Sequence, residues 1–588
     1  MVKPYDPLPA GPYIRLLELH HRCDDGFHGT FTAVSLDVES TPPYTAISYT
    51  WDKPVTHAAT LQMSNGRSLP LSQTVADLFS MFCGSHSQEN SRVGAGSNTD
   101  NRYSFYFWID ALCVDQNNRT ERASQVAQMG RVYSSAEQVL VWLGQGTSET
   151  RAAFAFMESK KDLARTEDWS YGPKVGPDID LILPLLTLPW FRRTWVIQEV
   201  ALNERVILVC GNDAVDFEIF RRSVNAVWKS GESEQDELQM EGLWNATQLF
   251  QIRGLYLDEG SVCYELLLQA AFYFETTDAR DAVFAFQGIA DSGSLPVPPP
   301  LYTVEVGQEP AYSESVDELY RRTAEALLCH GTSLDLLSLG GLSRERAPGL
   351  PTWVPDYRHL DFVAPFMSCN AAGWDTGGEL KVQPRLVAPD WLQIQARPLD
   401  TVESVCAPFD SSSVAGQQRA MTDIESLGKM LPKELRKGSW RKDLAMHLIF
   451  GLDIDDQQAG PEFRDYYIEW KEWLNASTSD ADLESIGQNK FHRAVGPRID
   501  DWVAFGTKQD RFCIGPPQVE AGDVLYVVPG CRMPLVLRPK SGGDGDGQFP
   551  DMPKQHWLVS WCYVSDMMNI TERDRGDVCQ PAIDIVLC

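Results

Sequence analysis

The sequence has few basic residues for its size, and this shortage limits what the protein can bind. Its 588 residues contain 51 Lys and Arg against 81 Asp and Glu, a formal net charge of −30. A surface of that charge repels phosphate backbones and anionic lipid head groups. We therefore expect no nucleic-acid partner.

Long apolar runs are also lacking. The longest, Leu181–Phe191, is interrupted by Pro184 and Pro189 and is too short to span a bilayer. The N-terminal stretch MVKPYDPLPAGPYIRLLEL has no apolar core of the kind found in signal peptides. These absences predict a soluble, cytoplasmic protein with no membrane span.

Motifs for metals and cofactors are missing as well. The 13 cysteines form no CxxC pair and no Cys/His cluster at zinc spacing, so free thiols and no metal site are expected. No Walker-type loop and no G-x-G-x-x-G precedes a helix, which excludes a nucleotide motor and a Rossmann dehydrogenase. We expect no bound cofactor.

What the chain does have is apolar residues, 43% of the total with 17 Trp, enough for more than one core. In the first 215 residues, apolar strand patterns alternate with helical ones, which is typical of an α/β domain with a parallel sheet covered on both faces. Residues 216–375 are predicted to be mainly helical, and 376–588 to form a β-rich domain with a helical insertion. The main segments predicted are the strands Tyr13–Glu18, Phe31–Val38, Thr45–Trp51, Phe105–Leu112, Gln138–Gly144 and Arg205–Cys210, the helix Gln73–Phe82, a helix capped by Thr120, and the loops Gly84–Arg102 and Ser541–Asp551.

The stretch Leu188–Asn203, LPWFRRTWVIQEVALN, predicts a turn and then a helix from Arg192 onward. Glu199 lies one helical turn from Trp195 on a mostly apolar stripe. A buried carboxylate needs a partner. The structural interpretation is an ion pair of Glu199 with Arg192, Arg193 or another arginine, and the functional one is catalysis.

A second polar group follows the strand FYFWIDAL, where Asp110, Cys113, Asp115 and Gln116 stand at its carboxyl end. Ligands bind at that edge of open α/β sheets. The two aspartates are suited to holding a ribose or a divalent ion, but Asp is equally common there as a cap or turn former. Cys113 is interpreted either as a nucleophile or as a small core residue.

Several words of the sequence together resemble the heterokaryon incompatibility (HET) domain family of filamentous fungi. They are YIRLLEL at Tyr13, YTAISYTW at Tyr44, FWIDALCVDQ at Phe107, ERASQVAQMGRVYSSAEQVLVWLG at Glu121 and PWFRRTWVIQEVAL at Pro189. Later words, such as TTDARDAVFAFQGIAD at Thr276, resemble segments that follow the domain in many of these proteins.

HET domains are regarded as distant relatives of TIR domains, so the resemblance implies a TIR-like, flavodoxin-like fold. The segment RTWVIQEV resembles the TIR helix that carries the glutamate for NAD cleavage, which implies that Glu199 is catalytic and that NAD is the substrate. The substrate-binding residues that we predict around Glu199 are Trp51, Asp110, Cys113, Gln116, Arg122, Arg193 and Trp195.

The family resemblance also implies a role in fungal non-self recognition and programmed cell death, with an allelic or non-allelic incompatibility partner. Two alternatives stay open at this level. One is a signalling scaffold that self-associates without chemistry, and the other is a small-molecule enzyme built on the same fold.

Overall fold

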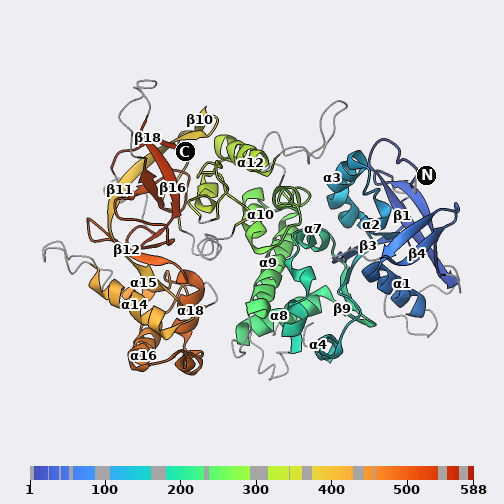
Figure 1. Cartoon of the computed structure of the whole chain (residues 1–588), viewed down its shortest axis with the longest axis horizontal. Coiled ribbons are helices and arrows are strands. Elements are labelled where there is room, and N and C mark those ends of the chain that lie inside the picture. The colour runs from blue at the N-terminus through green and yellow to red at the C-terminus, as the bar shows by residue number, and fades with distance from the viewer. Residues whose placement is uncertain are drawn as a thin grey trace. The chain divides into compact units, whose positions relative to one another are not determined.

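The computed structural model describes residues 5–23, 26–38, 41–51, 57–85, 106–159, 181–230, 237–291, 315–343, 345–359, 374–427, 443–454, 457–540, 553–568 and 580–588. The chain folds into two compact units (Figure 1). Unit 1 comprises Met1–Leu295 with Pro300–Glu314, and unit 2 comprises Pro296–Pro299 with Ser315–Cys588. The domain boundaries predicted at residues 215 and 375 would divide these units further, and they stay predictions.

Unit 1 contains one large mixed sheet. In the described residues its strand order is β5-β4-β2-β1-β6-β3-β7-β8-β9. The four strands β6-β3-β7-β8 are mutually parallel, whereas the strands at both edges include antiparallel pairs. The expected parallel sheet is therefore only the centre of a larger one. The strands are β1 Tyr13–Cys23, β2 Gly26–Ser35, β3 Tyr44–Tyr49, β4 His57–Met63, β5 Ser68–Ser72, β6 Tyr106–Trp108, β7 Gln138–Trp142, β8 Val206–Cys210 and β9 Asp213–Asp216.

Helices cover both faces of this sheet (Figure 1). Tyr44, at the start of β3, donates its hydroxyl to the Val132 carbonyl of α3, so even positions of β3 face that helix. Helix α1 packs on β4 and β5, and helix α9 packs on α6, α7 and α8. The helices are α1 Gln73–Ser85, α2 Asp110–Cys113, α3 Arg119–Ser135, α4 Ser148–Ser159, α6 Leu183–Leu186, η3 Pro189–Arg192, α7 Trp195–Ala201, α8 Phe217–Ser230, α9 Glu237–Glu259, α10 Tyr264–Ala270, η4 Ala271–Tyr273 and α11 Asp281–Phe284.

Most predicted elements of unit 1 are present, with three corrections. The strand predicted over Phe105–Leu112 ends at Trp108, and Asp110–Cys113 forms a helical turn instead. Helix α3 is capped by Asn118, whose side chain accepts from the Glu121 amide, rather than by Thr120. The predicted loop Ser541–Asp551 lies outside the described residues, and so does Gly84–Arg102 apart from residues 84–85, which end α1.

The helix expected from Arg192 onward is the third correction. The chain first forms the 3₁₀ turn η3, then becomes extended at Arg193, with φ −80° and ψ 130°, and α7 begins only at Trp195. The break has a physical cause outside the segment. The Arg192 carbonyl and the Thr194 amide both bond to the backbone of Glu275, which replaces the helical hydrogen bonds there.

Unit 2 is β-rich with a helical insertion, as predicted for the C-terminal part. Strand β11 pairs with β14 and β18, and β14, β15, β16 and β18 continue the pairing, so five strands close on themselves. Its strands are β10 Arg385–Ala388, β11 Trp391–Pro408, β12 Val503–Thr507, β13 Phe512–Gly515, β14 Val524–Val527, β15 Leu535–Pro539, β16 Gln555–Trp561, β17 Tyr563–Val564 and β18 Ile583–Leu587.

A core of mainly aliphatic side chains that includes Leu399, Val527 and Val559 fills the interior of this sheet. The helices of unit 2 are α12 Val316–His330, η6 Asp335–Leu339, α14 Val414–Ser426, α15 Leu444–Leu448, α16 Phe463–Ala476, η8 Asp480–Asp482, α17 Leu483–Ile486 and α18 Lys490–Ile499.

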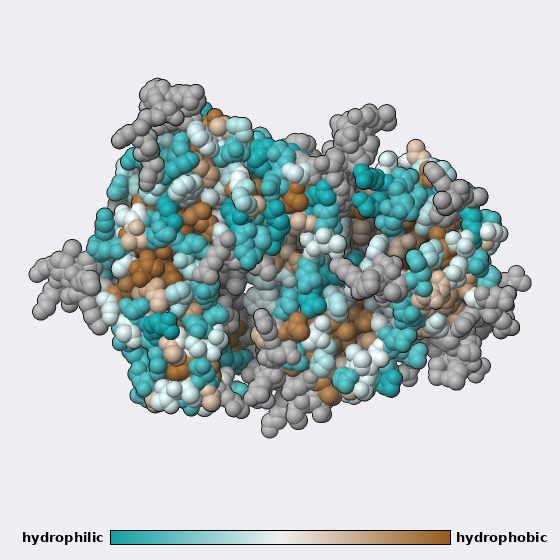
Figure 2. Space-filling view, viewed as in Figure 1, coloured by the Kyte–Doolittle hydropathy of each residue, from teal (hydrophilic) through white to brown (hydrophobic). Residues whose placement is uncertain are grey.

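The face drawn in Figure 2 is largely hydrophilic, with hydrophobic residues in small groups. None of the described helices combines the length and apolar character needed to cross a bilayer.

Candidate active site

The site begins with a polar residue inside a buried strand. Ser48 is fully buried in β3, where a hydroxyl needs hydrogen-bond partners. It donates to a carboxylate oxygen of Glu199 on α7 and accepts from the indole N–H of Trp190 at 2.8 Å. These three side chains form a hydrogen-bonded chain near the carboxyl end of β3.

Glu199 is strongly perturbed by this position. Only 3% of the residue is exposed, and burial raises the pKa of its carboxyl to about 7. The charge of Arg193 and the hydrogen bond from Ser48 lower that pKa, while the charge of Asp110 raises it. At neutral pH, Glu199 is therefore poised between its protonated and ionised forms.

Arg193 connects the end of β3 with both acidic groups. Its guanidinium donates to the Tyr49 carbonyl, and its charge stabilises the ionised forms of Asp110 and Glu199. Arg192 faces elsewhere: it lies 3.5 Å from the carboxylate of Glu275. Arg192 is thus not the ion-pair partner that we considered for Glu199.

Asp110 organises the edge of the sheet beside β3. Its carboxyl accepts from the indole N–H of Trp51 at 3.0 Å and from the Ala111 amide at 2.7 Å, and it hydrogen-bonds with the Tyr49 hydroxyl. Its carbonyl accepts from the Gln116 side-chain amide at 2.9 Å. Burial raises the pKa of Asp110.

A pocket of about 170 Å³ lies at this edge. Because Ser48 and Tyr49 are consecutive in β3, they point to opposite faces of the sheet. Ser48 faces Glu199, whereas Tyr49 lines the pocket together with Val75 of α1. Glu199 and the pocket therefore lie on opposite faces, joined at the carboxyl end of β3 by Asp110 and Arg193. The pocket is lined by Tyr49, Trp51, His57, Pro70, Ser72, Val75, Ala111, Leu112 and Gln116.

Three predicted site residues lie apart from this group. Cys113 is fully buried, its thiol lies 3.8 Å from the Phe107 carbonyl, and burial raises its pKa to about 12. Trp195 donates its indole N–H to Asp281 at 3.1 Å, away from Ser48. The charge of Arg122 acts on Asp278. Trp51, Asp110, Gln116, Arg193 and Glu199 are the predicted residues that the fold brings together.

Sequence reasoning did not include Ser48, Tyr49 or Trp190 among the site residues. A usable signal was present for Ser48, because a hydroxyl in the middle of the apolar strand TAISYTW requires a buried partner. Nothing local could show that the partner is Glu199, 151 positions away in the chain.

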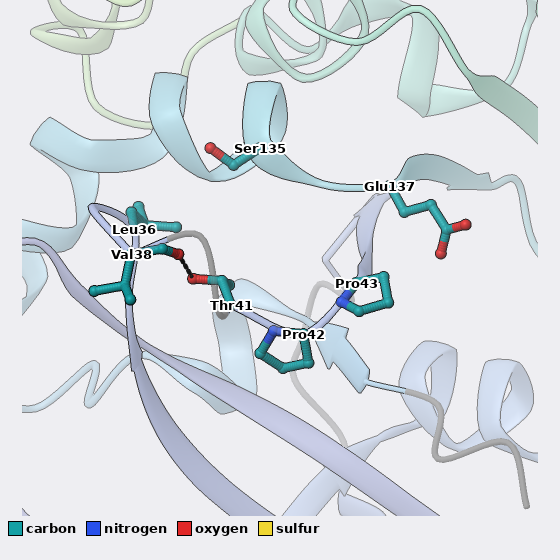
Figure 3. A pocket seen from close by; sticks show the side chains of 7 residues that line it. All are labelled: Leu36, Val38, Thr41, Pro42, Pro43, Ser135 and Glu137. Atoms are coloured by element: carbon teal, nitrogen blue, oxygen red, sulfur yellow. Dashed lines mark hydrogen bonds between the residues drawn. The ribbon is translucent and has the colours of Figure 1, made fainter.

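A larger pocket, of about 340 Å³, lies at the opposite edge of the sheet (Figure 3). Pro42 and Pro43 precede β3, and Ser135 and Glu137 precede β7, so this pocket adjoins the amino ends of the parallel strands. Ligand sites of open α/β sheets adjoin the carboxyl ends. The described residues contain no group of three or more His, Cys, Asp or Glu placed to hold a metal ion.

The chain is similar to known proteins in two comparisons. The family model described as Heterokaryon incompatibility protein (HET) matches residues 44–199, the segment that runs from the start of β3 to Glu199. The chain is also 23% identical to heterokaryon incompatibility protein 6, OR allele, of Neurospora crassa, over 91% of this chain and 92% of that protein. Residues 44–199 thus resemble a HET domain, and the chain as a whole resembles an incompatibility protein. No solved structure matches it.

The HET match contains most of the candidate site. Ser48, Asp110, Arg193 and Glu199 all lie within it, and Glu199 is its last residue. The residues that hold α7 from the far side, such as Glu275 and Asp281, lie beyond the HET match. The similarity to the Neurospora protein, in contrast, covers nearly the whole of both chains.

Proposed function

We propose that this protein acts in heterokaryon incompatibility, with death of the fused cell as its outcome, and that its HET domain is an enzyme that cleaves NAD. Similarity to heterokaryon incompatibility protein 6 over nearly its whole length supports the first part. The chemistry is supported by one observation above all: a buried glutamate with a pKa of about 7 at the carboxyl end of the central strand.

The arrangement of the parallel strands supports a TIR-like, flavodoxin-like HET domain. Numbered along the chain, β3, β6, β7 and β8 stand in the order 2-1-3-4, which matches the order of flavodoxin-like sheets. In such sheets the connections leave in opposite directions at the first and third strands, and ligands bind in the crevice there. Ser48 and its partner Glu199 lie beside the first of these strands.

A single carboxylate suffices for the proposed reaction. The bond between the ribose and the pyridinium nitrogen breaks with both electrons going to nitrogen, so nicotinamide leaves as a neutral molecule. Water then adds to the ribose carbon and releases a proton to solvent. Glu199, when ionised, stabilises the positive charge that develops on the ribose, and Arg193 favours that ionised form.

Because Glu199 is 3% exposed, the resting protein shields its carboxyl from solvent. We propose that the residues around α7 must move before NAD reaches it, and that an incompatibility partner or self-association drives this movement. Such a requirement keeps a lethal activity low until hyphae of different type fuse.

The test follows nicotinamide release by chromatography from NAD and the full-length protein, and NAD content in cells that express it. The variant is Glu199→Gln, with Glu218→Gln as matched control, because Glu218 on α8 is paired with Arg221 outside the site. We expect cells expressing the wild type or the control to lose NAD and viability once an incompatibility partner or self-association activates the protein, and Glu199→Gln to reduce release at least a hundredfold.

Cell death that is equal in the wild type and in Glu199→Gln, with NAD unchanged, would contradict the enzyme. That result would favour non-enzymatic signalling by self-association, which the burial of Glu199 in a hydrogen-bonded chain also supports. Growth without any death, together with turnover of another metabolite, would favour a small-molecule enzyme.

A further inference from the structure

The pocket beside Tyr49 has the size of a single aromatic ring. Its volume is about 170 Å³, and an apolar protein cavity of about 150 Å³ is known to hold benzene. Sites for whole drug-sized ligands are larger, from about 300 Å³ upward. A dinucleotide therefore cannot enter as a whole, but one ring of it can.

Two aromatic side chains form one side of this pocket, and one carboxyl holds both of them. The Tyr49 hydroxyl and the Trp51 indole N–H each hydrogen-bond to Asp110, which itself is not among the lining residues. The rings are thus fixed by their polar ends, and Trp51 keeps 36% of its surface exposed. A positive charge in the pocket would meet aromatic rings with the Asp110 carboxyl behind them, whose ionised form the charge of Arg193 favours.

Gln116 adds one polar atom to the wall. Its side-chain nitrogen donates to the Asp110 carbonyl at 2.9 Å, which fixes the orientation of the amide. The amide oxygen has no hydrogen-bond partner among the described residues and is available to accept from a ligand. The remaining lining consists of the apolar residues Pro70, Val75, Ala111 and Leu112 and the polar residues His57 and Ser72.

We propose that this pocket binds a monocyclic aromatic cation that carries an amide, as in the pyridinium ring of NAD. Aromatic faces attract such cations, and a nearby carboxylate adds to the attraction. The ring amide donates to Gln116. The assignment of the ring to NAD rests on the proposed function, whereas the cation preference rests on Tyr49, Trp51 and Asp110 alone.

The test uses two probes of nearly equal shape, 1-methylnicotinamide, which is a cation, and nicotinamide, which is neutral. Binding to full-length Glu199→Gln protein, which lacks the proposed catalytic carboxyl, is measured by calorimetry. We expect the cation to bind at least tenfold more tightly than the neutral ring. This comparison needs no variant of the pocket itself.

Two pocket variants sharpen the result. Asp110→Asn should remove most of the preference for the cation and leave the affinity for nicotinamide nearly unchanged. Trp51→Leu should weaken both probes about tenfold, whereas Trp557→Leu, at a tryptophan of unit 2 that is 37% exposed, should change neither.

Equal affinity for the two probes, or no binding of either at millimolar concentration, overturns the proposal. Cation binding that depends on Trp51 without nicotinamide release from the wild type supports the pocket assignment and contradicts NAD cleavage. Release that Trp51→Leu and Asp110→Asn leave unchanged contradicts the pocket assignment and supports cleavage at another place.

Discussion

At Glu199, burial raises the pKa of the carboxyl, whereas the charge of Arg193 and the hydrogen bond from Ser48 lower it. In the unfolded chain its carboxyl titrates near the ordinary value of 4.5, and in the folded protein its pKa is about 7. Between these two pH values the Glu199 carboxyl is protonated in the folded protein and ionised in the unfolded chain. The protein therefore loses stability as pH rises through this window, by ~3 kcal/mol in all.

This linkage leads to a test that does not depend on catalysis. Glu199→Gln removes the titration, so the unfolding free energy of the variant, relative to the wild type, should rise by ~3 kcal/mol between pH 4.5 and 8. Urea denaturation at several pH values measures the difference.

Glu218→Gln is the contrasting control. At Glu218 the effect of burial is outweighed by hydrogen bonds from Arg221 and Arg222, and the pKa is lowered. The relative stability of this variant should accordingly fall as pH rises through the acidic range. A Glu199→Gln curve parallel to that of the wild type would show that the Glu199 carboxyl is not held in its neutral form.

Cys113 provides a second test at the residue scale. Its thiol is fully buried and its pKa is raised to about 12, so almost no thiolate exists at neutral pH. We expect iodoacetamide to modify the exposed Cys263 in the native protein and to leave Cys113 unmodified, with both modified in urea. Mass spectrometry of tryptic peptides reads out both sites. Equal native rates would restore Cys113 as a candidate nucleophile.

At the scale of elements, α7 is a short helix held mainly from outside. It has seven residues, too few for independent stability. Arg253 of α9 is 7% exposed and donates to the carbonyls of Val200, Asn203 and Glu204 at the carboxyl end of α7. Such an arginine donates to the carbonyls that a helix leaves unpaired at its carboxyl end. Its positive charge also interacts favourably with the helix dipole there.

Removal of this cap should be costly. Arg253→Met leaves buried carbonyls without donors, and we expect a loss of ~3 kcal/mol in unfolding free energy. Arg221→Met is the matched control, because Arg221 pairs with Glu218 at the surface of the neighbouring helix, and its loss should cost below ~1 kcal/mol. Chemical denaturation measures both. Equal costs would mean that Arg253 does not hold α7.

Helix α7 also shows how much of the fold can be predicted from the local sequence. Apolar runs identified β3, β7 and β8 to within two residues, because a buried parallel strand has a continuous apolar pattern. The start of α7 at Trp195 could not be found in this way. It depends on the backbone of Glu275, about eighty positions later, and propensity says nothing about such a contact. The site followed the same rule: Glu199 and Asp110 were predicted, and their hydrogen-bond partners Ser48 and Tyr49 were not.

At the scale of the molecule, the HET match and the compact unit that contains it have different ends. The match ends at Glu199, whereas unit 1 extends to Glu314. Between them lie contacts that hold the site, including Glu275 on the Arg192–Thr194 backbone and Gly288, whose amide donates to Gln198. Gly288 also lies against Gly130 of α3, where any side chain would collide with the facing backbone. Residues after the match are thus part of the structure around the site.

Two fragments distinguish these boundaries. A fragment of residues 1–215 keeps Ser48 and Glu199 but loses Arg253 and Asp281, and it exposes the surfaces of α6 and α7 that α9 covers. We expect it to aggregate or to unfold without a sharp transition, because the apolar area that it cannot bury outweighs its small stability margin. A fragment of residues 1–314 should unfold cooperatively and keep the fluorescence of the buried Trp190.

Thermal unfolding with size-exclusion chromatography compares the two fragments, with 315–588 as the control for unit 2. A monomeric 1–215 fragment with a sharp transition would instead show that the HET domain needs none of the later contacts, and would move the functional boundary back to the end of β9.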